Sequence, residues 1–147
     1  MTARAGTVTD TYAAALQHDL VDVGDATLVG VVRRPTRWFS PAVDENHPSL
    51  GPPPALLDEF QDLREDFEMR GLCAEGAHNA AWDDLDVETR YREHLQTDAA
   101  AREAVDELVD RVRGGEDVAL VCFENTEQKR CHRTALLDHL RERLDAT

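Results

Sequence analysis

The stretch VALVCFENTEQKRCHRTALL, residues 118–137, decides the fold of this chain. It opens with the apolar run VALVCFE (118–124), which shows no alternation of polar and apolar residues. Such a run is typical of a strand that is buried on both faces of a parallel sheet. After a polar turn, a helical periodicity begins, with Leu136, Leu137, Leu140 and Leu144 on one side. The stretch therefore predicts a strand, a short turn and a final helix.

Two earlier segments also read as strands. The run ATLVGVV (26–32) is apolar and rich in β-branched residues, and Pro35 and Pro41 prevent it from continuing. Residues 8–16 are weaker evidence, because Val8, Tyr12, Ala14 and Leu16 follow a period of two but the alanines would also suit a helix. We interpret residues 8–16 as a strand.

Helices and loops are expected between these strands. A helix should follow the prolines and stop near Gly71, a short one should start after Asp86, and another should run from about Asp98 to Arg113 and end at the glycines 114–115. Residues 40–54 contain five of the six prolines and read as a long surface loop, and residues 72–86 read as an irregular connection. The order of elements predicts one α/β domain over residues 1–147, with a mostly parallel central sheet flanked by helices.

The charge balance of the chain is strongly acidic. Thirty Asp and Glu face sixteen Lys and Arg among 147 residues, which gives a net charge of −14. Lys129 is the only lysine, and there is no isoleucine. Dispersed acid of this kind is typical of halophilic proteins, although an ordinary solvated surface would also account for it. Because the Debye length falls to about 3 Å in molar salt, the global charge argues only mildly against a nucleic-acid partner.

Compartment signals favour a cytoplasmic protein. The chain has no run of about 18 apolar residues, so no contact with a membrane is expected. The N-terminal residues lack the apolar segment of a signal peptide. The three cysteines, at 73, 122 and 131, are too few and too unevenly spaced for a disulfide scaffold, which favours a reducing environment.

Positive charge follows the apolar strands predicted over residues 26–32 and 118–124. Arg33, Arg34 and Arg37 come after the first, and Lys129, Arg130, His132 and Arg133 come after the second. Ligands of open parallel sheets bind beyond the carboxyl ends of the strands, so both clusters should line the same edge. The second cluster also lies at a helix N-terminus, where cations are unfavourable unless an anion binds there. The alternative is that these side chains form surface ion pairs, for example with Glu124 or Glu127.

Cys131 is the candidate reactive residue. A helix N-terminus, a neighbouring histidine and nearby cations each lower a thiol pKa, and the thiolate is the reactive form. Glu124, at the end of the strand, is a candidate acid or base. The alternative is that Cys131 is a small buried residue that packs the helix start against the sheet.

Other sites have weaker support. Cys122 lies in an apolar strand and reads as a core residue, and the C-x8-C-H spacing of Cys122, Cys131 and His132 matches no standard zinc motif. The common nucleotide-binding, hydrolase and metalloprotease motifs do not occur. Cys122 and Arg130 are too far apart for the C-x5-R phosphate loop of tyrosine phosphatases. No metal or cofactor is therefore expected.

The ordered motifs resemble an uncharacterised family, domain of unknown function 488. CFENTEQKRCHR matches its late Cys-x-Glu strand and its Cys-His-Arg helix start, VGVVRRPTRWFSP resembles its strand leading into Arg-x-Pro, and YREHL (91–95) resembles its tyrosine helix. The turn NTEQKR departs from the acidic-Pro turn that is commoner in the family. The resemblance extends from about Thr11 to Leu144. The resemblance implies an α/β fold and adds Tyr91 to the candidate binding residues, but it assigns no reaction. Together with the acidic composition, it suggests a halophilic, archaeal-type member of the family.

These observations favour an enzyme-like domain acting on an anionic substrate that bears phosphate or is a nucleic acid. Cys131 would be the reactive thiol, His132 and Arg133 would hold protons or charge, and Glu124 would be the acid or base. The substrate would be bound by Arg33, Arg34, Arg37, Lys129, Arg130 and Tyr91. Two alternatives stay open: a non-catalytic module that binds nucleic acid or a nucleotide on the same edge, and a purely structural protein. Convergence of Cys131, Arg133 and Arg33 on one exposed crevice would favour a site.

Overall fold

A parallel β-sheet forms the centre of the molecule. The computed structural model describes residues 5–18, 22–37, 39–122 and 129–145. Within these residues, four strands pair in parallel in the order β1-β4-β2-β3. Their bounds are Val8–Tyr12 for β1, Thr27–Gly30 for β2, Glu45–Asn46 for β3 and Val118–Cys122 for β4. The predicted α/β class with a parallel sheet is confirmed.

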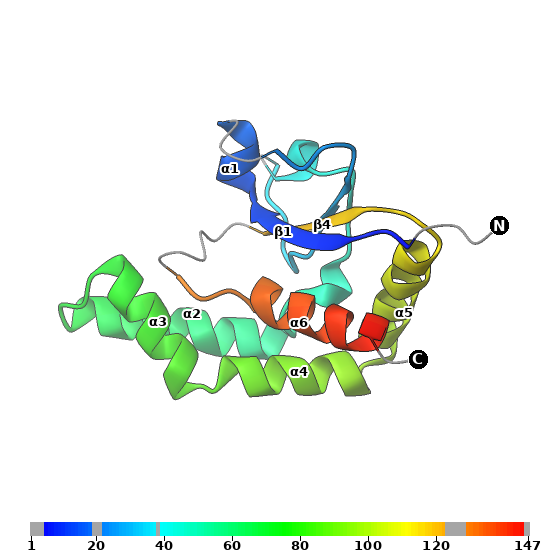
Figure 1. Cartoon of the computed structure of the whole chain (residues 1–147). Coiled ribbons are helices and arrows are strands. Elements are labelled where there is room, and N and C mark those ends of the chain that lie inside the picture. The colour runs from blue at the N-terminus through cyan, green and yellow to red at the C-terminus, as the bar shows by residue number, and fades with distance from the viewer. Residues whose placement is uncertain (1–4, 19–21, 38, 123–128, 146–147) are drawn as a thin grey trace.

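Strand β4 is one of the two inner strands of the described sheet, and the core is built around it. It pairs with β1 on one side and with β2 on the other, and all five of its residues are buried. Helix α6 (His132–Asp145) packs against β1 and β4, and α4 (Val87–Thr97) and α5 (Ala99–Arg113) pack against α6. Figure 1 shows α4 and α6 below the sheet and α1 above it. Cover on both faces explains why the strand is apolar at every position.

The expected strand over residues 8–16 is wrong in its second half. The strand ends at Tyr12, and Ala13–Gln17 form the short helix α1. Ala13 and Ala15 are buried in this helix. Alanine has the highest helix propensity, so the alanines favour a helix here even though the spacing of apolar residues also fits a strand.

The expected irregular connection over residues 72–86 is also wrong, because residues Ala74–Asp84 form helix α3. The side chain of Cys73 accepts a hydrogen bond from the backbone N–H of Gly76 at 3.3 Å and so caps the helix start. The buried face consists of Ala77, His78, Ala81 and Trp82. These residues recur at helical spacing, but two alanines and a histidine give little apolar signal.

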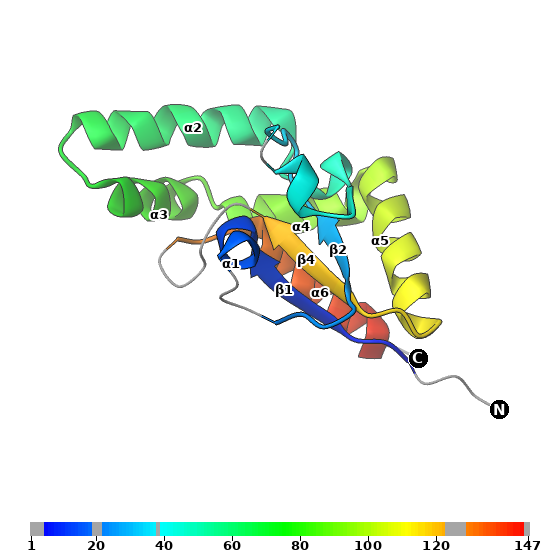
Figure 2. The same ribbon diagram turned by 90° about the horizontal axis from the view of Figure 1, so that it is seen from above.

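Helices α2 (Pro54–Met69) and α3 form an antiparallel pair that extends to one side of the sheet (Figure 2). Gly71 joins them with a φ of 104°, a left-handed conformation that favours glycine and ends α2 as predicted. Leu56 and Phe60 of α2 pack against Ala81 and Trp82 of α3 in a second hydrophobic cluster. This pair forms one wall of the site described below.

The remaining helices follow their predicted spans. Helix α4 buries Val87, Tyr91 and Leu95, and α6 buries Leu136, Leu137 and Leu140. Asp98 caps the N-terminus of α5, because its side chain accepts a hydrogen bond from the backbone N–H of Ala101 at 3.0 Å. The predicted periodicity of these three helices matches the faces that they bury.

The proline-rich segment 40–54 contains more regular structure than a surface loop. It holds the 3₁₀ turns Ser40–Ala42 and Pro48–Leu50 and the short strand β3 between them. Leu50 is fully buried in the main core. The end of this segment is therefore fixed against the main core.

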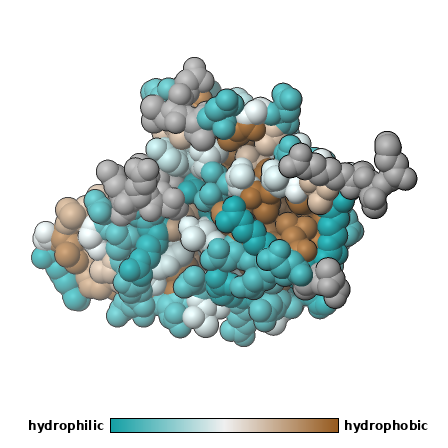
Figure 3. Space-filling view, in the orientation of Figure 1, coloured by the Kyte–Doolittle hydropathy of each residue, from teal (hydrophilic) through white to brown (hydrophobic). Residues whose placement is uncertain are grey.

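The face that carries α4 and α6 is predominantly polar. Figure 3 shows hydrophilic residues over most of the face that carries α4 and α6, as a chain of net charge −14 would lead one to expect. Among the described residues, no helix is long and apolar enough to span a membrane.

Candidate functional site

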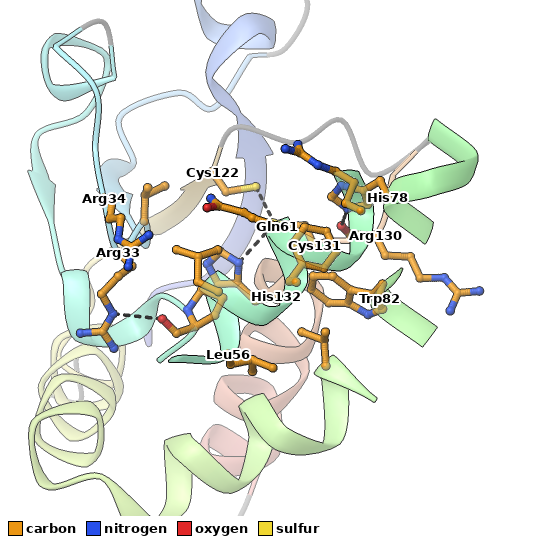
Figure 4. A pocket seen from close by; sticks show the side chains of 16 residues that line it. Arg33, Arg34, Leu56, Gln61, His78, Trp82, Cys122, Arg130, Cys131 and His132 are labelled. Atoms are coloured by element: carbon orange, nitrogen blue, oxygen red, sulfur yellow. Dashed lines mark hydrogen bonds between the residues drawn. The ribbon is translucent and has the colours of Figure 1, made fainter. Parts of the chain in front are cut away.

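A pocket of about 200 Å³ lies beyond the carboxyl ends of β2 and β4. The two strands run parallel, so the residues that follow them meet at one edge of the sheet. The segment after β2 supplies Arg33 and Arg34. Arg130 and Cys131, just before α6, and His132, its first residue, complete this side. Figure 4 shows Cys131 and His132 between Arg33 on one side and Arg130 with Trp82 on the other.

Helices α2 and α3 supply the opposite wall. Its apolar part is built mainly by Leu56, Leu57, Phe60 and Trp82. Arg64, His78 and Gln61 add polar groups to it. A second cavity, of about 340 Å³, shares Trp82, Arg130 and Cys131 with this pocket. Cys131 therefore borders two neighbouring cavities.

The charge of the pocket is opposite to that of the chain. Among the described residues that line it, four are arginines, at positions 33, 34, 64 and 130, and none is Asp or Glu. Acids outnumber bases by thirty to sixteen in the chain as a whole. The pocket is therefore a local concentration of positive charge.

Arg33 and Arg64 have no carboxylate partner within the described part of the chain. Arg33 Nε donates to the carbonyl of Pro52 at 3.0 Å, and its Nη2 donates to the carbonyl of Gly51 at 3.4 Å. These carbonyls orient the guanidinium without neutralising it. Arg64 Nε is buried and has no hydrogen-bond partner among the described residues. A buried donor of this kind costs free energy unless a ligand or water satisfies it.

Arg34 and Arg130 are instead held by ion pairs at the rim. Arg34 Nη1 lies 3.0 Å from Asp58 Oδ1, and Arg130 pairs with Asp83. All four side chains are at least half exposed, so these pairs contribute little to stability. The surface ion pairs considered from the sequence thus occur for Arg34 and Arg130, with partners other than Glu124 and Glu127, which lie outside the described residues.

Two thiols meet at the pocket. Cys122, at the end of β4, and Cys131, just before α6, have sulfurs 2.8 Å apart. Both are buried, with 1% and 6% of their surfaces exposed, and both line the pocket. Burial, together with the hydrogen bond to Cys131, raises the pKa of Cys122 well above its usual value. Cys122 is therefore a buried core residue, which agrees with its interpretation from the sequence.

His132 is positioned to exchange a proton with Cys131. Its Nε2 lies 2.6 Å from the carbonyl oxygen of Val31, which can only accept a hydrogen bond. Nε2 therefore carries a proton, and Nδ1 of the neutral ring faces the Cys131 sulfur at 3.6 Å with its lone pair. The Tyr91 ring packs edge-on against the imidazole, with centroids 5.2 Å apart.

Arg133 lies behind the pocket. It is 1% exposed and does not line the cavity. Its Nε donates to Asp10 at 2.8 Å, and its Nη1 donates to the carbonyl of Thr11 and contacts the Cys122 sulfur at 3.2 Å. The expected convergence on one crevice therefore holds for Cys131 and Arg33 but not for Arg133.

Four further candidates lie outside the pocket lining or outside the described residues. Tyr91 is fully buried and donates from its hydroxyl to the carbonyl of Leu50 at 2.5 Å. Arg37 is exposed, and Lys129 is half-buried, and neither lines the cavity. Glu124 lies outside the described residues.

The pocket-lining residues of α2 and α3 are not among the site candidates predicted from the sequence. Arg64 falls four residues after Phe60, so it lies on the buried face of an otherwise regular amphipathic helix. A charged residue on the apolar face of a helix is a pattern from which Arg64 could have been recognised as a candidate site residue. His78 and Trp82 lie one turn apart on α3, and they were missed because that helix was interpreted as irregular. Within the described chain, no group of three or more His, Cys, Asp or Glu is arranged to hold a metal ion.

Comparison with known proteins places the chain in a family. No curated protein and no solved structure matches it. Residues 12–144 match the family described as the active DUF488-N3 subclade, which covers most of the chain. The chain therefore belongs to the DUF488 family.

Proposed function

We propose that this protein is an enzyme that binds an anionic, phosphate-bearing substrate in the arginine-lined pocket and attacks it with Cys131. The observation that carries this proposal is the charge of the pocket. Four arginines and no carboxylate line it among the described residues, in a chain of net charge −14. Arginine binds phosphate and carboxylate groups through paired N–H donors.

Arg33 and Arg64 would hold the anionic group of the substrate. Both lack a carboxylate partner in the described chain, so an incoming anion does not have to displace one. Arg64 Nε would also gain the hydrogen-bond partner that it lacks among those residues. Arg34 and Arg130 would add charge at the rim while keeping their exposed ion pairs.

The chemical step would use Cys131 and His132. His132 Nδ1 accepts the thiol proton, and the sulfur bonds to the electrophilic atom of the substrate. The leaving group departs with its bonding electrons and takes the proton from the imidazolium. The Val31 carbonyl fixes the ring and stabilises its protonated form, as the third group of a catalytic triad does.

The other sequence-predicted residues have supporting roles in this proposal. Arg133 would position the start of α6, and Tyr91 would orient His132 through ring contact. Arg37 and Lys129 would contact parts of a larger substrate, such as a nucleic acid, that extend outside the pocket. Glu124 stays a candidate second acid or base.

A binding module without catalysis is the second candidate. The same arginines could hold a nucleotide or a nucleic-acid phosphate with no reaction at Cys131. Substitution of Cys131 by serine separates the two functions: the enzyme loses turnover, whereas the module keeps its affinity. Substitution of Arg64 by glutamine weakens both.

Alkylation of Cys131 by two matched reagents tests the proposal. Iodoacetate is anionic and iodoacetamide is neutral, but both alkylate a thiolate by the same reaction. On a Cys73→Ser background, with the modified site mapped by mass spectrometry, we expect iodoacetate to react faster in the folded protein. In the urea-unfolded chain we expect the neutral reagent to react at least as fast, because the acidic chain repels the anion.

Variants of single arginines provide the control. Arg64→Gln or Arg33→Gln should reduce the preference for iodoacetate by about tenfold, the equivalent of about 1.4 kcal/mol for one lost ionic hydrogen bond. Arg37→Gln, an exposed arginine outside the pocket lining, should leave the preference unchanged. Equal loss in all three variants, or no preference in the parent, would exclude an anion-selective pocket.

We also infer that the protein works in the cytoplasm of a cell with concentrated internal salt. The support is compositional: dispersed acids, a single lysine and three cysteines too few for a disulfide scaffold. The melting temperature should rise as KCl increases toward molar concentrations, because salt screens the repulsion among surface carboxylates. A melting temperature independent of KCl would contradict this inference.

A further inference from the structure

The two pocket thiols are close enough to be joined by a small movement. The Cys122 and Cys131 sulfurs are 2.8 Å apart, and a disulfide bond measures about 2.0 Å, so they need to approach by roughly 0.8 Å (2.8 minus 2.0). Cys122 is the last residue of strand β4, whereas Cys131 precedes the first residue of α6. The proposed catalytic step uses only Cys131 and leaves the neighbouring thiol without a role.

Access to the pair is restricted to small molecules. Cys122 is 1% exposed and Cys131 is 6% exposed, and the pocket that reaches them measures about 200 Å³. A hydroperoxide group needs less room at these two sulfurs than the disulfide of another protein. A hydroperoxide consists of two oxygens and a small substituent, so it fits the pocket.

We propose that Cys122 and Cys131 form a peroxide-reactive dithiol that is oxidised to an intramolecular disulfide. The Cys131 thiolate attacks one oxygen of the hydroperoxide, the O–O bond breaks, and an alcohol, or water from hydrogen peroxide, leaves after protonation. Cys131 is then a sulfenic acid, and the peroxide has been reduced by two electrons. The Cys122 sulfur attacks the sulfenic sulfur and forms the S–S bond, and the hydroxyl group leaves as water with the proton of the Cys122 thiol.

The surroundings of the pair suit each half of this reaction. His132 Nδ1 lies 3.6 Å from the Cys131 sulfur and accepts its proton in the first step. Arg133 Nη1 lies 3.2 Å from the Cys122 sulfur, so a buried guanidinium stabilises negative charge there in the second step. Because the two sulfurs start in contact, disulfide formation should compete well with further oxidation of Cys131.

The test is an oxidation experiment on the Cys73→Ser protein, which removes the exposed third thiol. The folded protein is treated with hydrogen peroxide, quenched, denatured and labelled with N-ethylmaleimide, and its intact mass and peptides are then measured. We expect the loss of both remaining free thiols, a peptide that links Cys122 to Cys131, and full recovery after dithiothreitol. The same disulfide should form at least about tenfold more slowly in urea, where the two sulfurs are no longer held together.

A second variant tests the order of the two steps, and its folding is checked separately. In Cys73→Ser, Cys122→Ser, confirmed as folded by circular dichroism, Cys131 should accumulate as a sulfenic acid that dimedone traps. In the Cys73→Ser parent, dimedone should trap almost none, because Cys122 resolves it. The proposal is overturned if Cys131 in the parent proceeds to sulfinic acid while Cys122 stays reduced, or if peroxide reacts no faster with the folded protein than with the unfolded chain.

Discussion

Arg133 Nε donates a hydrogen bond to Asp10 Oδ2 at 2.8 Å, which joins the first turn of α6 to strand β1 across 123 residues of sequence. The same guanidinium donates to the carbonyl of Thr11 and contacts the sulfur of Cys122. One side chain therefore connects α6 with the two strands on which it packs. The positions of Cys131 and His132 at the helix start depend on this connection.

Arg133→Gln should destabilise the protein by roughly 2–4 kcal/mol, because it breaks the ion pair of a buried arginine with the partly buried Asp10 and leaves the Thr11 carbonyl without that donor. Lysine should not restore the loss, since only a guanidinium reaches several acceptors at once. Urea unfolding followed by circular dichroism measures the effect. Arg37→Gln, on an exposed side chain, should stay within about 0.5 kcal/mol of the parent. An equal midpoint for Arg133→Gln and the parent would refute this role.

Tyr91→Phe should cost about 1–2 kcal/mol of stability, because the variant leaves the buried Leu50 carbonyl without the hydroxyl donor. Burial raises the pKa of Tyr91 well above its usual value, which indicates a hydroxyl that stays protonated in the folded state. The ring that packs on His132 is kept in phenylalanine, so alkylation of Cys131 should change little. A large fall in Cys131 reactivity without loss of stability would instead point to a catalytic hydroxyl.

Glu45 should contribute stability that depends on pH. The hydrogen bonds from Arg111 lower the pKa of Glu45 below its ordinary value of 4.5, against an opposing effect of burial. Because the folded state favours the ionised carboxyl, this contribution is present above pH 4.5 and is lost as the pH falls through the lower folded value.

Thermal unfolding between pH 7 and pH 3 measures this contribution. Glu45→Gln should lower the melting temperature at neutral pH. The difference in melting temperature between this variant and the parent should shrink as the solution becomes acidic. Glu103→Gln, on an exposed residue of α5, serves as the matched control and should follow the parent throughout. Parallel curves for the parent and Glu45→Gln would contradict the expectation.

Gly51→Ala should disturb the pocket through Arg33. A Cβ at Gly51 would lie 2.8 Å from the Cα of Arg33, too close for real atoms, so the backbone of the two segments would have to separate. We expect a loss of about 1–3 kcal/mol and a smaller preference of Cys131 for iodoacetate. In Gly114→Ala the new Cβ would meet only carbonyl oxygens at 3.4 Å and 3.5 Å, so both quantities should be retained. A pocket selectivity unaffected by Gly51→Ala would show that Arg33 does not contribute to it.

The sequence by itself determined the class of the fold and the edge at which the pocket lies. The runs 26–32 and 118–124 could be recognised as strands because both are continuous and largely apolar, and all five residues of β4 are buried. The predicted parallel pairing brought Arg33 and Arg130 to the same edge, where the structure has them. The local sequence was sufficient to recognise these strands, because a continuous apolar run indicates a strand that is buried on both faces.

Only the tertiary structure decided which of the candidate residues reach the pocket. Arg133 follows His132 in sequence, yet it points to the partly buried carboxylate of Asp10, because successive residues of a helix point in different directions. Arg64 and Trp82 reach the pocket only because α2 and α3 fold back beside the sheet edge. Such contacts join residues that are far apart in the chain, and a local pattern of apolar and polar residues carries no record of them.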